Sequence, residues 1–142
     1  MAQTKNFLAK AATWQKSLNN LKRTINKAEL FAKKLGISTS DDFICQALIQ
    51  ALEMSIESLW KFIRIVLIEQ HGIDAVASPK GVFHQALSLN IISQEEFDTL
   101  ANILDSRNLM AHTYDQEQAE HIVEKIMIYA TLMEQVGQSV SQ

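Results

Sequence analysis

The chain has 142 residues, which is enough for one domain, residues 1–142, to bury a core without help from a metal ion or a disulfide. One proline and four glycines beside abundant alanine, leucine, glutamate and lysine argue against a fold of strands and tight turns, and favour an all-α, up-and-down bundle of four to five helices. The net charge is -3. Because the chain has no uncharged apolar run of about 18 residues and its N-terminus does not resemble a secretory signal, we expect a soluble cytoplasmic protein.

The first predicted helix ends at Gly36 and carries a single apolar stripe. Residues 1–4, which precede it, are expected to fray. The stripe follows the spacings of three and four that are typical of an amphipathic helix. Its members are Phe7, Ala11, Trp14, Leu18, Leu21, Ile25, Ala28, Ala32 and Leu35.

Basic residues are concentrated in this first helix. Residues 1–35 hold eight lysines and arginines against Glu29 alone, a net charge of +7, so the rest of the chain carries -10. Such a helix can follow a phosphate backbone, dock on an acidic protein, or simply face solvent. The sequence leaves these three interpretations open.

The second predicted helix begins after Ser40, Asp41 and Asp42, which offer N-cap oxygens, and runs to about Gln70. It is apolar on nearly every side, so we expect a central helix covered by several neighbours. Cys45, the only cysteine, is expected to be a buried thiol. The polar exceptions form a narrow strip, which consists of Gln46, Gln50, Glu53, Glu57, Lys61 and Arg64.

Three shorter helices are predicted in the second half. Ser78 with Pro79 starts one that ends near Asn90, and Ser93 with Glu96 forms a capping box for the next. Asp115 is the N-cap candidate of the final helix. Residues 137–142 are expected to fray.

Arg107 lies where a core residue is expected, because it continues the stripe of Phe97, Leu100 and Leu104. A buried guanidinium needs a carboxylate partner, a place at a subunit interface, or an anionic ligand. The simplest partner is Glu53, Glu57 or Asp105, in an ordinary salt bridge.

The run from Ser106 to Asp115 also contains Asn108, His112 and Tyr114. In one unbroken helix, Arg107 and His112 would point about 140° apart. Their convergence therefore needs a helix end, which the cap signal at Asp115 places near residues 112–114, or a second chain. An unperturbed histidine can exchange protons at neutral pH, although a histidine at a helix end is more often a cap or a surface residue.

Other chemical signatures are weak. The remaining histidines show no paired metal spacing, and Gly81 stands alone rather than in a phosphate-binding loop. We therefore expect neither a metal ion nor a cofactor.

The order Arg107, four residues, His112, one residue, Tyr114 resembles the signature of the HEPN superfamily (higher eukaryotes and prokaryotes nucleotide-binding). More narrowly, the chain resembles HepT-type toxins, also described as nucleotidyltransferase substrate-binding proteins, which are encoded beside a minimal nucleotidyltransferase. The resemblance covers about residues 5–136. Further matches are Glu53, Glu57, Trp60, Lys61, the run Ser78-Pro79-Lys80, where Lys80 replaces a common arginine, and the run from Asp105 to Asp115.

The resemblance implies a dimer whose two Arg-His motifs face each other across a cleft, bound to its nucleotidyltransferase as a heterotetramer or larger. It implies a toxin-like, metal-independent endoribonuclease in which Arg107 stabilises the scissile phosphate, His112 moves protons and Asn108 orients the pair. Glu53 and Glu57 would be supporting polar residues. Tyr114 would accept AMP from the nucleotidyltransferase, which neutralises the toxin.

Two alternatives stay open. The chain can be a non-catalytic subunit that binds nucleotide or presents substrate to a nucleotidyltransferase. It can also be a dimeric helical adaptor in which Arg107 only forms an interface salt bridge.

Overall fold

The computed structural model describes residues 3–39, 41–112 and 115–142, with residues 109–112 described by their backbone alone. The described part of the chain is helical and forms a bundle, as the sequence predicts. In these ranges no helix has both the length and the apolar character needed to cross a membrane. The helices are α1 (Lys5–Leu35), α2 (Asp42–His71), α3 (Pro79–Ser88), α4 (Gln94–His112), α5 (Gln116–Glu124) and α6 (Ile126–Val140).

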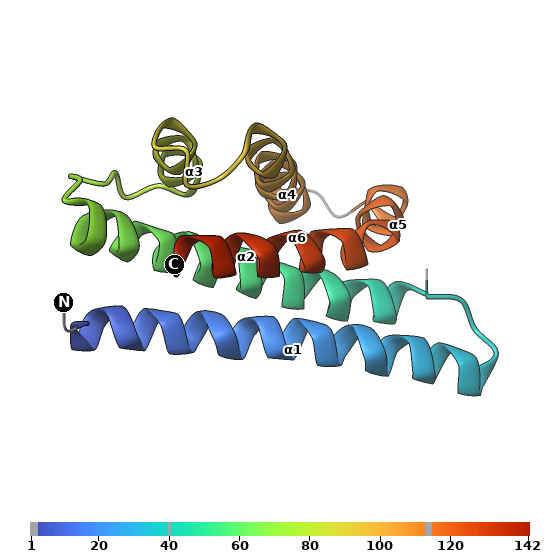
Figure 1. Ribbon diagram of the computed structural model, residues 1–142. Helices are drawn as coiled ribbons and strands as arrows, with labels where there is room; N and C mark the ends of the chain where they lie inside the picture. The colour runs from blue at the N-terminus through green and yellow to red at the C-terminus, as the bar shows by residue number, and fades with distance from the viewer. Residues whose placement is uncertain (1–2, 40, 113–114) are drawn as a thin grey trace.

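Helix α2 is the centre of the bundle, because it contacts all five other helices. Helices α1 and α2 run side by side as a long antiparallel hairpin, and α6 extends along the same direction (Figure 1). The shorter helices α3, α4 and α5 are seen nearly end-on in that view and cover α2 on the side away from α1. The prediction of a central, widely covered second helix is thus confirmed.

The ends of the helices follow the sequence signals closely. Asp41 accepts hydrogen bonds from the backbone N–H groups of Phe43 and Ile44, at 3.1 and 3.4 Å. The capping box is reciprocal, since Ser93 N–H donates to Glu96 Oε1 at 2.8 Å and Glu96 N–H donates to Ser93 Oγ at 3.1 Å. Thr4 caps α1, a role that the sequence analysis did not assign.

Glycine ends the two long helices. Gly36 and Gly72 have φ angles of 66° and 64°, the left-handed conformation that glycine adopts without a steric penalty. Both helices therefore end at these glycines, where the chain changes direction.

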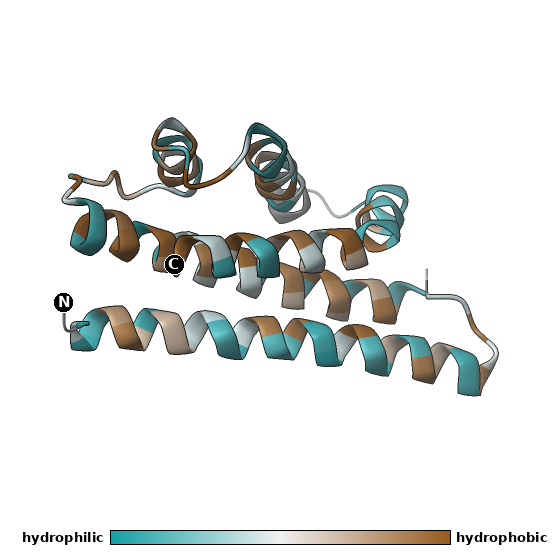
Figure 2. Cartoon of the chain, in the orientation of Figure 1, coloured by the Kyte–Doolittle hydropathy of each residue, from teal (hydrophilic) through white to brown (hydrophobic). Residues whose placement is uncertain are grey.

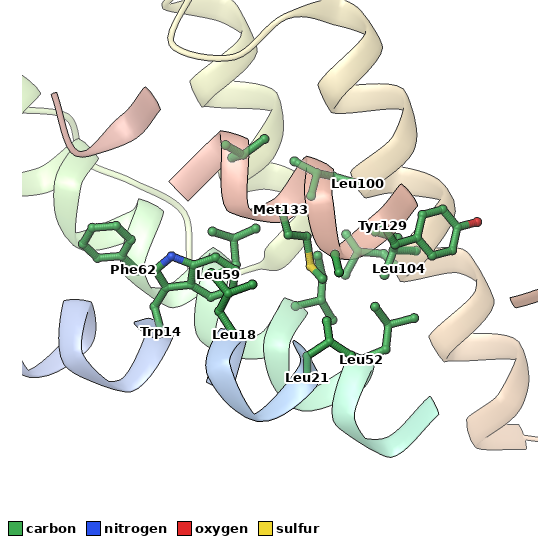
Figure 3. Packing of buried hydrophobic residues seen from close by; sticks show 14 of the residues in the cluster. Trp14, Leu18, Leu21, Leu52, Leu59, Phe62, Leu100, Leu104, Tyr129 and Met133 are labelled. Carbon is green, nitrogen blue, oxygen red and sulfur yellow. The ribbon is translucent and has the colours of Figure 1, made fainter. Parts of the chain in front are cut away.

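The core lies between α2 and the helices around it. Hydrophilic residues are far more prominent on α1 than on α6, as Figure 2 shows, in keeping with one buried stripe on α1. Cys45 is fully buried, as predicted, and burial raises the pKa of its thiol above the ordinary value. Side chains of α1, α2, α4 and α6 meet in the core, where Figure 3 labels Trp14, Leu18, Leu21, Leu52, Leu59, Phe62, Leu100, Leu104, Tyr129 and Met133.

The C-terminal region differs from the prediction in two ways. The expected single last helix is broken at Lys125, whose N–H bonds back to the carbonyl of Ile122, three residues earlier, at 3.1 Å. The change of direction lets α5 and α6 pack separately against α2. The expected fraying from residue 137 is not seen, because α6 continues to Val140, and Val136 and Val140 are buried.

Gly137 allows α6 to approach α1 closely. A Cβ atom at this position would lie 2.9 Å from Cε2 of the buried Trp14 indole, well inside van der Waals contact. Because an indole in the core cannot move aside cheaply, the glycine is required by packing rather than by backbone conformation.

We predict that Gly137→Val lowers the free energy of unfolding by about 1–3 kcal/mol, because the added atoms overpack the contact with Trp14. Urea denaturation would measure the loss. Gln138→Val, one position along the same helix, is the matched control for helix propensity. Equal losses in the two variants would contradict the packing role of Gly137.

Candidate functional site

Arg107 lies near the C-terminal end of α4, on the face that the buried Leu104 and Leu100 occupy one and two turns earlier. Its side chain retains 27% of its accessible surface. The position in a core register is therefore confirmed, but the guanidinium reaches the edge of the bundle. It combines a fixed orientation with access to solvent.

Glu57 of α2 compensates the charge of Arg107. Arg107 Nη1 donates to Glu57 Oε2 at 2.9 Å, and Arg107 Nη2 donates to Asn108 Oδ1 at 3.5 Å. Among the three carboxylates that the sequence offered, Glu57 is the one in the ion pair. The charge of Arg107 is thus balanced within one chain, without a second subunit.

Glu57 is itself held by two neighbours on its own helix. Trp60 Nε1 donates to Glu57 Oε2 at 3.0 Å, and Lys61 Nζ lies 3.2 Å from Glu57 Oε1. Partial burial raises the pKa of Glu57, but the hydrogen bonds from Trp60 and Lys61 and the charges of Lys61 and Arg107 outweigh it, so the pKa is lowered. Glu57 therefore stays ionised at neutral pH.

The sequence analysis did not find the hydrogen bond of Trp60 to Glu57. The side chain is partly buried and packs against the core, but its N–H serves the site. The spacing was the available signal, because residues three and four apart on a helix face each other. By that rule Trp60 and Lys61 both lie next to Glu57.

Glu53, one turn before Glu57, is in a different environment. It lines a small hollow with Ser106, Arg107 and aliphatic side chains from α2, α4 and α5. Burial raises the pKa of Glu53, and the charge of Arg107 opposes the rise without cancelling it. The two glutamates beside Arg107 thus have pKa values shifted in opposite directions.

Asp105 pairs with Lys80 rather than with Arg107. Lys80 Nζ lies 3.0 Å from Asp105 Oδ1, and both side chains are more than half exposed. This pair links α3 to α4. Lys80, which stands where related sequences commonly have arginine, therefore forms an ion pair with α4, the helix that carries Arg107.

The other motif residues are only partly described. Helix α4 ends at His112 and α5 begins at Gln116 with Asp115 as its N-cap, which confirms the predicted helix end between them. The side chain of His112 and the whole of Tyr114 lie outside the described residues. Their convergence with Arg107 stays a prediction. Within the described ranges, no group of three or more His, Cys, Asp or Glu residues could hold a metal ion.

Comparison with known families supports the family resemblance. The model of a family described as "Nucleotidyltransferase substrate binding protein like" matches residues 9–142. A search of curated proteins finds no match.

Solved structures share the fold along nearly the whole chain. A protein of Thermus thermophilus is 29% identical, with a TM-score of 0.75 and coverage of 91% of this chain and 99% of that one. A tri-AMPylated HEPN toxin of Shewanella oneidensis in complex with MNT antitoxin is 17% identical, with a TM-score of 0.71 and 98% of each chain covered. A mutant of the toxin-antitoxin MntA-HpeT is also 17% identical, with a TM-score of 0.73, covering 97% and 98%.

We predict that Glu57→Gln lowers the free energy of unfolding at neutral pH by about 1 kcal/mol or less, since both partners of the ion pair are partly exposed. Because the pKa of Glu57 is lowered from 4.5, its contribution is present above that pH and is lost as the pH falls below it. The difference between the two proteins should shrink in acid.

Urea denaturation at neutral pH and below pH 4.5 would measure this difference. Glu29→Gln on the exposed face of α1 is the matched control for loss of a carboxylate. A difference that stays constant across the pH range would contradict the ionised state of Glu57.

Proposed function

The chain belongs to the nucleotidyltransferase substrate-binding protein-like family, and from this membership and the Arg107 site we propose that it is the toxin of a toxin-antitoxin pair and a metal-independent endoribonuclease. The observation that carries the proposal is the ion pair of Arg107 with Glu57, which fixes a partly exposed cation beside the His112 end of α4. Two solved structures of the same fold are described as toxin-antitoxin systems.

The proposed chemistry needs a proton carrier and a cation. Cleavage of RNA by attack of its own 2'-hydroxyl requires removal of one proton, donation of another, and stabilisation of charge on the phosphate. His112 would move the protons and Arg107 would stabilise the phosphate. A guanidinium presents five N–H donors in a planar fork, so Arg107 can hold Glu57 and a phosphate together.

Asn108 and Glu57 would set the direction of Arg107. Asn108 Oδ1 accepts from one Nη atom and Glu57 from the other, so the plane of the guanidinium is held at both ends. Orientation of this kind lowers the entropy cost of binding a phosphate in the reactive position. Glu53 would tune the local charge, because its raised pKa brings it nearer to the neutral form.

The proposed active form is a homodimer bound to a minimal nucleotidyltransferase, as a heterotetramer or a larger assembly. Two copies of the Arg107 end of α4 would face each other across a cleft and share one RNA strand. The antitoxin would close this cleft. The fold that this chain shares with a toxin solved in complex with MNT antitoxin supports such an assembly.

We predict that the purified protein cleaves single-stranded RNA in the presence of a chelator, and that Arg107→Lys and His112→Ala each lower the rate at least 100-fold. Lysine keeps the charge but lacks the fork, and alanine removes a general acid-base group that is worth about 10²–10⁴ in rate. Cleavage of a labelled RNA would be followed by gel electrophoresis.

Matched controls are Arg23→Lys on α1 and His121→Ala on α5, whose side chains are exposed. Both should cleave as the wild type does. Cleavage that survives Arg107→Lys and His112→Ala would refute the assignment. Nucleotide binding without any cleavage would favour the alternative, a non-catalytic substrate-binding subunit.

We also propose Tyr114 as the acceptor of AMP. The support is the tri-AMPylated toxin with the same fold, together with the position of Tyr114 in the motif. The phenol oxygen would attack the α-phosphate of ATP held by the nucleotidyltransferase, and pyrophosphate would leave. An adenylyl group beside Arg107 would then block the cleft.

We predict an added mass of one adenylyl group or more after co-expression with the neighbouring nucleotidyltransferase. Tyr114→Phe should lose the modification at that position and regain RNA cleavage in the presence of the partner. The chain has two tyrosines, and the buried Tyr129, changed to Phe, is the matched control. Mass spectrometry that finds Tyr114 unmodified would favour inhibition by occlusion alone.

A further inference from the structure

A cluster of exposed hydrophobic side chains surrounds the turn between α1 and α2. Phe43 retains 88% of its accessible surface and Phe31 retains 55%. Leu30, Leu35 and Ile37 beside them are also exposed. Exposed apolar clusters of this kind are more common at interaction sites than on the rest of a protein surface.

The cluster surrounds a groove between the two helices, here called the tip groove. Lys27, Ala28 and Phe31 of α1 and Phe43, Ile44 and Ala47 of α2 line it. Its volume is about 320 Å³, large enough for an aromatic side chain to enter. The two exposed phenylalanines stand on opposite sides of the groove, one on each helix.

The two sides of the tip groove carry opposite charges. Lys27 and Lys34 lie one turn before and one turn after Phe31 on α1. Asp41 and Asp42 lie at the start of α2, immediately before Phe43. The helix dipoles favour a cation such as Lys34 at the C-terminal end of α1 and anions such as Asp41 and Asp42 at the N-terminal end of α2. They explain neither the position of Lys27 nor the exposure of the apolar side chains.

We propose that the tip groove binds a second copy of this chain about a two-fold axis parallel to the α1–α2 hairpin. Under that rotation the α1 side of one copy faces the α2 side of the other at the same height. The lysines of each copy then meet the aspartates of its partner. Phe43 of each copy enters the partner's tip groove, as in other self-complementary, isologous interfaces.

The charge pattern decides both the axis and the occupant. A two-fold axis perpendicular to the hairpin would place lysines against lysines, and like charges across an interface cost free energy. A nucleic acid or an anionic membrane would meet Lys27 and Lys34 but would be repelled by Asp41 and Asp42 on the other side. A second copy presents the complement of both sides at once.

This contact is separate from the proposed RNA site. Phe43 and Glu57 are 14 residues apart on α2, which corresponds to about 21 Å along the helix axis. The tip contact therefore does not depend on RNA cleavage. It can operate together with a dimer formed around Arg107, in which case it joins such dimers into a larger assembly.

The first test is the mass of the full chain in solution, measured by light scattering over a range of concentrations. Phe43→Ser should lower the mass of the associated wild type at least twofold, with an unchanged circular dichroism spectrum because Phe43 is exposed. Ile128→Ser, an exposed hydrophobic on α6, is the matched control and should leave the mass unchanged. A monomeric wild type, or equal masses for wild type and Phe43→Ser, would overturn the proposal.

A charge exchange tests whether the occupant is a second copy. The double variant Lys27→Glu, Lys34→Glu and the variant Asp42→Lys should each lose the association, since each places like charges together. In a mixed contact, one half keeps the native pairs of lysines with aspartates, and in the other half the introduced glutamates face the introduced lysine. An equal mixture of the two should therefore form mixed assemblies of the wild-type mass. A mixture that stays dissociated would overturn the pairing of the two charged sides.

Discussion

A helix that is apolar on nearly all sides must be covered on nearly all sides, and α2 imposes this requirement on the whole bundle. Thirty residues long, it contacts every other helix. The long hairpin partner α1 covers one side, and α6 together with the layer of α3, α4 and α5 covers the rest (Figure 1). Burial of apolar surface drives folding, and the residues of α2 form the largest share of the buried core that a single helix contributes.

The candidate site lies on the polar strip of α2, where this requirement is relaxed. Glu57 is the member of this strip that forms an ion pair with α4, because the apolar stripe of α4 places Arg107 beside it. The pair lies at the edge of the core, so it avoids the full cost of burying two charges. Packing therefore sets the position of Arg107, and the ion pair sets its direction.

The extent to which the sequence determined these features depended on the range of the interactions involved. Local signals predicted the capping box of Ser93 and Glu96, the caps at Asp41 and Asp115, and the helix end at Gly36, because these depend on neighbours within a few residues. The break at Lys125 was missed, since neither glycine nor proline marks it and the change of direction is set by packing on α2.

The same distinction holds in the site. Arg107 was predicted to need a carboxylate, but the choice of Glu57 over Glu53 and Asp105 depends on how α4 crosses α2 and on Lys80 of α3 holding Asp105. Such choices are made by tertiary contacts between residues up to 50 positions apart. The contact of Trp60 with Glu57 could have been predicted from the sequence, because the two residues are three positions apart on one helix.

The shared acceptor of Arg107 and Trp60 has an optical consequence. One oxygen of Glu57 receives both the guanidinium and the indole N–H, so a ligand that draws Arg107 away changes the polarity felt by the indole ring. The other tryptophan, Trp14, is buried in the core between α1 and α6 and is insulated from such events. The fluorescence of Trp60 should thus respond to a ligand at the candidate site, whereas that of Trp14 should stay constant and serve as an internal reference.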